Sequence, residues 1–133
     1  MPTMTMPQSH TWRHSIQTAE RLLRDSNKQL SFLMRTRKPL ELAIKPNGKL
    51  ARFQREAMDL FLLLYWYQRG ECRGPSYHTL ILATAAFHYL SCTRDVRDFW
   101  RRPESVEAVF DHVFREIELD FRDFQAWRQK QGL

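Results

Sequence analysis

The stretch GPSYHTLILATAAFHYLSCT, residues 74–93, contains no Lys, Arg, Asp or Glu, whereas these four types make up 27% of the 133-residue chain. Such a stretch must be shielded from water by the rest of the protein, by a partner or by lipid. It is long enough to span a bilayer, but Pro75, two His and several Ser and Thr residues favour protein surroundings. We therefore expect residues 77–91 to form a central helix with Ser76 as its N-cap.

Length and composition indicate one helical domain. A chain of 133 residues with 43% hydrophobic residues can bury a core as a single domain. The chain has only four Gly, and Pro103 is the only proline beyond position 75. Few glycines and prolines favour long helices. We expect an all-α fold, a small helical bundle of about four main helices with a central apolar helical hairpin. Residues 1–10 are expected to form a disordered N-terminal tail and residues 11–133 a single helical domain.

Two further helices are expected around the central one. A helix over residues 50–68 ends in LFLLLYWY, residues 60–67, which is apolar all round, as in a central helix. It would form the hairpin with residues 77–91. Apolar side chains then recur at helical spacing over residues 106–127, which predicts an amphipathic last helix that covers the hairpin.

The N-terminal part predicts a basic outer layer. Residues 11–34 have helical periodicity, with Ser26-Asn27 as a candidate break. The helix should stop before Pro39, since proline disfavours helix in the residue before it. Residues 40–44 are then expected as an extended segment or a single helical turn, and residues 45–49 as a turn. The cations on the polar face of this first helix are Arg13, Arg21, Arg24 and Lys28.

Residues 69–75 read RGECRGP and residues 88–99 read HYLSCTRDVRDF, between and after the two apolar helices. With the helices around them, over residues 53–127, these segments resemble the YkvA-like family of small helical proteins. Members of that family have a Gly–Arg–Tyr–Pro-type turn and a motif like YFLSPIDLIPDF, to which Leu90-Ser91 and Asp98-Phe99 correspond. The resemblance implies the helical fold and, through the paired apolar helices, proximity to a membrane.

The chain departs from that family at its prolines and carboxylates. Cys92 and Arg97 stand where the family has prolines, and Arg94 stands where it has the first aspartate. Ser105-Val106 replace an Asp-Asp pair. The family carries no firmly established biochemical activity, so the resemblance implies no catalytic site.

Charge is unevenly distributed along the chain. Residues 1–55 carry eleven Lys or Arg and three Asp or Glu, a net charge of +8. Residues 56–133 carry ten Lys or Arg and twelve Asp or Glu, a net charge of −2. A basic N-terminal half favours an anionic partner, and the alternative is a merely solvated surface. The cations expected to bind an anion or a partner are Arg35, Arg37, Lys38, Lys45, Lys49, Arg94, Arg97, Arg101 and Arg102. The apolar interface candidates are Trp66, Trp100 and Trp127.

Motifs for catalysis are missing from the sequence: it has no P-loop, GxGxxG, nucleophile elbow or HExxH. On the expected central helix His78 and His88 lie about 15 Å apart, too far to share one metal ion. Cys72 and Cys92 lack CxxC spacing and are expected to be unpaired, with a disulfide left open. We expect no enzyme activity, no metal and no cofactor, and no small-molecule substrate is evident.

The sequence thus predicts a non-catalytic helical interaction or scaffold module that binds a protein partner, with an anionic membrane surface as a further candidate. The expected location is the cytoplasm, peripheral to the membrane. The alternative is a nucleic-acid-binding or regulatory protein that uses the basic N-terminal half. No helix-turn-helix, zinc-finger or ribonucleoprotein motif supports that alternative, which rests on charge.

Overall fold

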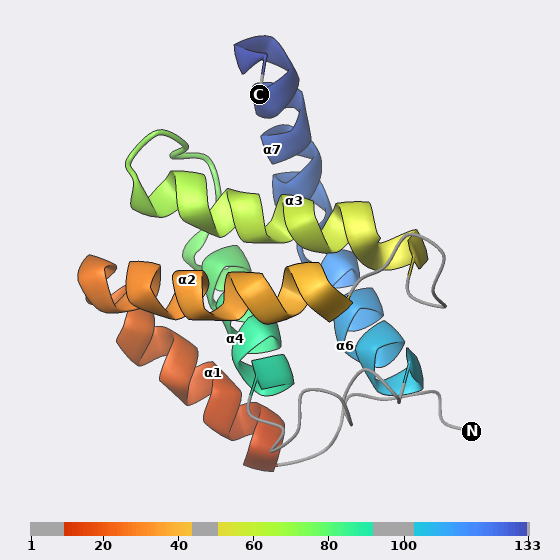
Figure 1. Ribbon diagram of the computed structural model, residues 1–133. Helices are drawn as coiled ribbons and strands as arrows, with labels where there is room; N and C mark the ends of the chain where they lie inside the picture. The colour runs from red at the N-terminus through yellow and green to blue at the C-terminus, as the bar shows by residue number, and fades with distance from the viewer. Residues whose placement is uncertain (1–9, 44–50, 92–102, 133) are drawn as a thin grey trace.

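The computed structural model describes residues 10–43, 51–91 and 103–132, and all regular structure in these ranges is α-helical (Figure 1). The all-α prediction is confirmed, but the expected number of about four main helices is wrong. The described residues form six helices, because two of the expected helices are each divided into two. They are α1 (His10–Leu23), α2 (Ser26–Ala43), α3 (Ala51–Gln68), α4 (Tyr77–Ser91), α6 (Pro103–Glu116) and α7 (Glu118–Gln131).

The first division separates α1 from α2 next to the candidate break. Asp25 Oδ1 accepts hydrogen bonds from the backbone N–H groups of Asn27 at 3.0 Å and Lys28 at 3.2 Å. A carboxylate that binds the free N–H groups of a first turn is an N-cap, and it starts a new helix. The end of α1 and the start of α2 meet at the left edge of Figure 1.

Helix α2 continues past Pro39, so the expectation that the helix stops before this proline is wrong. A proline removes one N–H donor and crowds the preceding turn, but the residues on either side can keep helical dihedral angles at a local cost. Before the proline the helix is anchored: Phe32 is buried, and Thr36 Oγ1 donates a hydrogen bond to the Phe32 carbonyl oxygen at 2.8 Å. Residues 40–43, expected as extended chain or a single turn, complete α2.

The second division lies at Ile117, inside the segment expected as one last helix. Ile117 has φ −111° and ψ 17°, outside helical values, and it is 2% exposed. Hydrogen bonds still run from Ile117 N to the Val113 carbonyl oxygen (3.0 Å) and from Phe121 N to the Ile117 carbonyl oxygen (2.9 Å). The chain therefore bends here without losing its backbone pairing.

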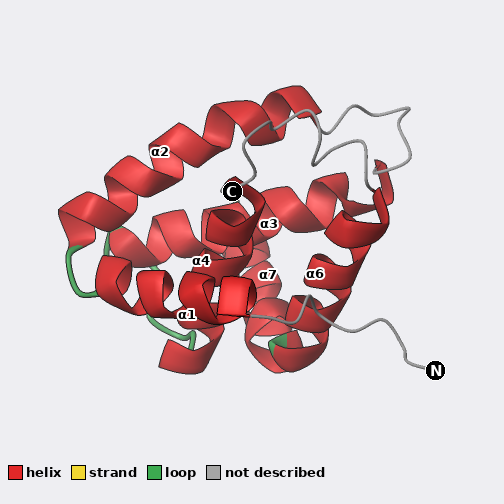
Figure 2. Cartoon of the chain, turned by 90° about the horizontal axis from the view of Figure 1, so that it is seen from below, coloured by secondary structure: helices red, strands yellow, loops and turns green. Residues whose placement is uncertain are grey.

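Helix α4 is the centre of the fold, as the uncharged stretch predicts. Its bounds are those expected from the sequence, and Figure 2 shows it in the middle of the other helices. It packs most extensively on α1 and also on α3 and α6. Ala83, Ala86 and Phe87 are essentially inaccessible, and the expected contact between the two apolar helices α3 and α4 is present. None of the helices in the described ranges has both the length and the apolarity that a bilayer crossing requires.

Two polar contacts fix α7 on this core. Asp120 Oδ2 accepts hydrogen bonds from Ser76 N (2.7 Å) and from Thr79 Oγ1 (2.5 Å), at the start of α4. Ser76 Oγ accepts a bond from Thr79 N at 3.2 Å, which confirms Ser76 as the N-cap. On α3, buried Asp59 forms an ion pair with Arg128 of α7. Both ends of α7 are thus tied to the apolar helices.

Candidate functional site

Exposed cations gather around the turn between α1 and α2. Arg21 on α1, Arg24 in the turn and Lys28 on α2 are all exposed. Arg13 is eight residues before Arg21 on α1, about 80° around the helix and about 12 Å along it. Arg35 is seven residues after Lys28 and shares its side of α2. We call the three exposed residues at the turn, Arg21, Arg24 and Lys28, the basic face.

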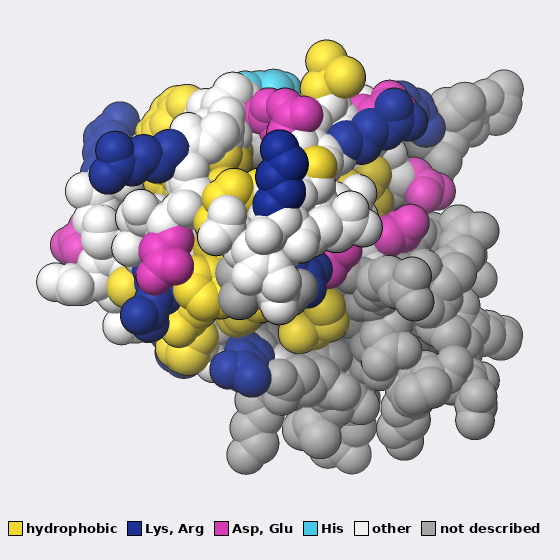
Figure 3. All heavy atoms as spheres, turned by 90° about the horizontal axis from the view of Figure 1, so that it is seen from above, with side chains coloured by type: hydrophobic (Ala, Val, Ile, Leu, Met, Phe, Trp, Pro, Cys, Tyr) yellow, Lys and Arg dark blue, Asp and Glu magenta, His cyan; other side chains and the backbone are white. Residues whose placement is uncertain are grey.

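The first two helices and the last two helices of the described residues carry net charges of opposite sign. Residues 10–43, which form α1 and α2, contain seven Lys or Arg and three Asp or Glu. Residues 103–131, which form α6 and α7, contain four Lys or Arg and seven Asp or Glu. On the face drawn in Figure 3, Lys and Arg side chains lie at several places, some beside Asp or Glu side chains and others among uncharged and apolar ones. Arg21, Arg24 and Lys28 are exposed close together at the α1–α2 turn, so a polyanion would find three cations there.

The structure places only some of the predicted binding residues. Arg35 and Arg37 are both exposed on α2, but two residues correspond to about 200° around a helix, so they lie on different sides. Lys38 lies in α2, and the structure describes its backbone but not its side chain. The predicted residues outside the described ranges are Lys45, Lys49, Arg94, Arg97, Trp100, Arg101 and Arg102.

Two of the three predicted interface tryptophans lie in the described ranges, and both pack against the core. Trp66 is partly buried and meets the Tyr65 ring edge-on at 5.3 Å between centroids. Trp127 is also partly buried and stacks on Phe124 at 5.9 Å. Their role in an interface stays a prediction, because each has a structural contact within its own helix.

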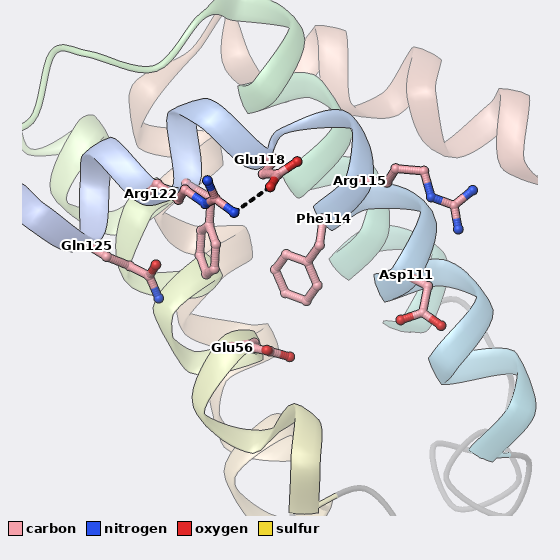
Figure 4. A pocket seen from close by; sticks show the side chains of 8 residues that line it. Glu56, Asp111, Phe114, Arg115, Glu118, Arg122 and Gln125 are labelled. Atoms are coloured by element: carbon pink, nitrogen blue, oxygen red, sulfur yellow. Dashed lines mark ion pairs between the residues drawn. The ribbon is translucent and has the colours of Figure 1, made fainter.

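A groove lies between α3, α6 and α7 (Figure 4), and sequence reasoning did not identify it. Its volume is about 490 Å³. In Figure 4 the ring of Phe114 projects into the groove, Glu56 and Asp111 border it, and Arg115 extends away from that ring. The lining residues are Glu56, Asp111, Phe114, Arg115, Glu118, Phe121, Arg122 and Gln125. We call it the α3–α6–α7 groove.

A polar contact between α1 and α4 involves His88. Its Nδ1 lies 2.9 Å from Ser15 Oγ, and its ring lies 5.7 Å from that of His14. Burial lowers the pKa of His88, and the nearby His14 and Arg21 add to this effect. Ser15 is 1% exposed, so the contact serves the packing of α1 on α4. In the described residues, no three His, Cys, Asp or Glu side chains come together as a metal site requires.

Comparison of the chain with protein-family models, with curated proteins and with solved structures finds no match in any of the three. The resemblance to the YkvA-like family stays a prediction from the residues quoted above.

Proposed function

We propose that the chain is a non-catalytic helical binding module whose basic face binds an acidic segment of a protein partner. The observation that carries this proposal is the group of exposed cations around one helix turn, Arg21, Arg24 and Lys28. The helices that present them are held by a buried core, so the cations project from a rigid support. Rigid presentation lowers the entropy lost on binding.

Exposed Met34 favours protein over nucleic acid as the partner. It is 43% exposed and adjoins Arg35 on α2. Met34 lies about 100° around α2 from Arg35 and about 120° from Lys28, so it borders the basic face, and Met and Arg are both enriched in protein interfaces. A surface that binds nucleic acid would instead contact phosphates along its length, with a steep dependence on salt.

The experiment is binding of a fluorescent polyglutamate peptide to the purified chain at 150 mM salt, by anisotropy. The variant Arg24→Glu/Lys28→Glu reverses two charges of the basic face. The control Arg73→Glu/Lys130→Glu makes the same charge change at two exposed residues elsewhere. We expect about a tenfold loss of affinity for the first and less than about a twofold change for the second. Equal loss in both variants contradicts a defined face.

The same three proteins distinguish the alternatives. A mixed-sequence DNA duplex and RNA strand test the nucleic-acid-binding alternative, and flotation with phosphatidylserine vesicles tests an anionic membrane surface. Tighter binding to DNA or RNA than to polyglutamate, lost in the basic-face variant, favours the nucleic-acid alternative. If the wild type and the control variant float with the vesicles and the basic-face variant does not, the basic face binds an anionic membrane.

A further inference from the structure

The α3–α6–α7 groove has an aromatic wall. The ring centroids of Phe114 and Phe121 lie 5.0 Å apart. Phe114 also stacks on Phe110, with 5.7 Å between the ring centroids. Phe121 and Phe110 are buried, whereas Phe114 is only partly buried and projects into the groove (Figure 4). A ring held in this way offers its surface to a ligand without rearrangement.

Carboxylates border this ring from two helices. Glu56 comes from α3 and Asp111 from α6, and both residues are exposed. Glu118 forms an exposed ion pair with Arg122 of the same helix at 2.6 Å. Glu56 makes no ion pair or hydrogen bond among the described residues. Three carboxylates (Glu56, Asp111 and Glu118) and two guanidinium groups (Arg115 and Arg122) line the groove, so its formal charge is −1.

A ring and carboxylates are what a guanidinium or ammonium group needs. The cation is attracted to the ring face and to the carboxylates, while its alkyl chain covers apolar surface. We propose that the α3–α6–α7 groove binds an arginine or lysine side chain from a basic peptide segment of a protein partner. The volume of about 490 Å³ exceeds what one such side chain fills, so neighbouring peptide residues can also be held, for example by the Gln125 amide. This goes beyond the proposed function, because the groove and the basic face use different residues and opposite charges.

The test uses a fluorescent peptide of alternating Arg and Gly at 150 mM salt. A second peptide has citrulline in place of Arg, which keeps the shape and removes the charge. We expect the citrulline peptide to bind at least about tenfold more weakly. Glu56→Gln should weaken binding of the Arg peptide up to about fivefold, the affinity change that corresponds to one exposed ion pair. Phe114→Leu keeps an apolar side chain and removes the ring, so it should weaken the Arg peptide more than the citrulline peptide.

The matched controls are Glu116→Gln and Asp123→Asn. Both residues are exposed on α6 and α7 but do not line the groove. We expect less than about a twofold change in Kd for each. Glu56 is exposed, so its variant should keep the fold, which circular dichroism checks.

Equal weakening by Glu56→Gln and Glu116→Gln overturns the proposal, because it indicates general attraction to an acidic surface. Equal affinity for the Arg and citrulline peptides overturns it as well. Self-association of the chain that Glu56→Gln abolishes in sedimentation would assign the groove to a second copy and also overturn it. Loss of polyglutamate binding belongs to the basic face, so the two proposals can fail separately.

Discussion

Asp120 links α7 to the start of α4 through its carboxylate. The hydrogen bond from Thr79 and then that from Ser76 N lower the pKa of Asp120 below its usual value. A lowered folded-state pKa means that this carboxylate stabilises the fold above the unfolded pKa of about 3.9 and that the contribution disappears as pH falls through the folded value. We expect Asp120→Ala to cost about 1 kcal/mol at pH 7, as loss of a helix cap does. Urea unfolding at pH 7 and pH 3 measures the difference from the wild type, which should shrink at pH 3; Asp123→Ala, at an exposed position, is the control.

His88 should also make stability fall as pH decreases, but in a higher pH range than Asp120 does. Its folded-state pKa is lowered, by burial first and then by His14 and Arg21, so the unfolded chain takes up a proton at higher pH. Stability is therefore complete above the usual pKa of about 6.5, falls as pH decreases below it, and levels off below the folded value. NMR titration of the His88 ring should show a midpoint below about 6.5, and Arg21→Gln should move it upward. A midpoint that stays in place in Arg21→Gln contradicts the assigned charge effect.

At the scale of elements, the Asp25 cap decides where α2 begins. It accepts two backbone N–H groups, and alanine would leave both to water. We expect Asp25→Ala to lower the free energy of unfolding by about 1 kcal/mol and Asp25→Asn to lower it by less, since Asn also caps well. Chemical denaturation of the two variants checks this order.

A partly buried ion pair joins α3 to α7, and its contribution to stability can be tested. Asp59 binds Arg128 and also accepts a hydrogen bond from Gln125 Nε2 at 3.2 Å. Arg128→Met should cost about 3 kcal/mol, because it leaves the buried Asp59 carboxylate without its cation. Adding Asp59→Leu should recover most of that loss, since an apolar pair of similar volume is often neutral. A double variant no more stable than Arg128→Met would show that the ion pair itself supplies the stability.

Sequence reasoning located the elements better than their ends. α4 was predicted to the residue, because Ser76 and a charge-free run mark one helix and its start. The bend at Ile117 was not predictable, because apolar side chains at a 3.6-residue period fit one straight helix as well as two. The start of α2 depends on whether Asp25 or Ser26 caps, and both residue types are good N-caps.

The same limit applies to the two candidate surfaces. Arg21, Arg24 and Lys28 lie within eight residues of one another, so the sequence places them close together, although the break between α1 and α2 changes how they are arranged. The α3–α6–α7 groove joins Glu56 to Phe114, 58 positions later, and depends on how α6 and α7 bend over α3. No local pattern encodes that juxtaposition, because it follows from tertiary packing.

For the whole molecule, two surfaces of opposite charge predict two independent binding activities. Arg24→Glu/Lys28→Glu should weaken polyglutamate binding about tenfold and leave binding of the Arg-Gly peptide unchanged. Glu56→Gln should weaken binding of the Arg-Gly peptide up to about fivefold and leave polyglutamate binding unchanged, with the assays run separately. At 150 mM salt the Debye length is about 8 Å, so charges changed at the α1–α2 turn should alter peptide affinity at the groove by less than about twofold. At 20 mM salt, screening is weaker, and the same charge reversal should strengthen the binding of the cationic peptide. Anisotropy titrations at both salt concentrations measure this, and parallel loss of both ligands in either variant at 150 mM would show that the chain has a single binding surface.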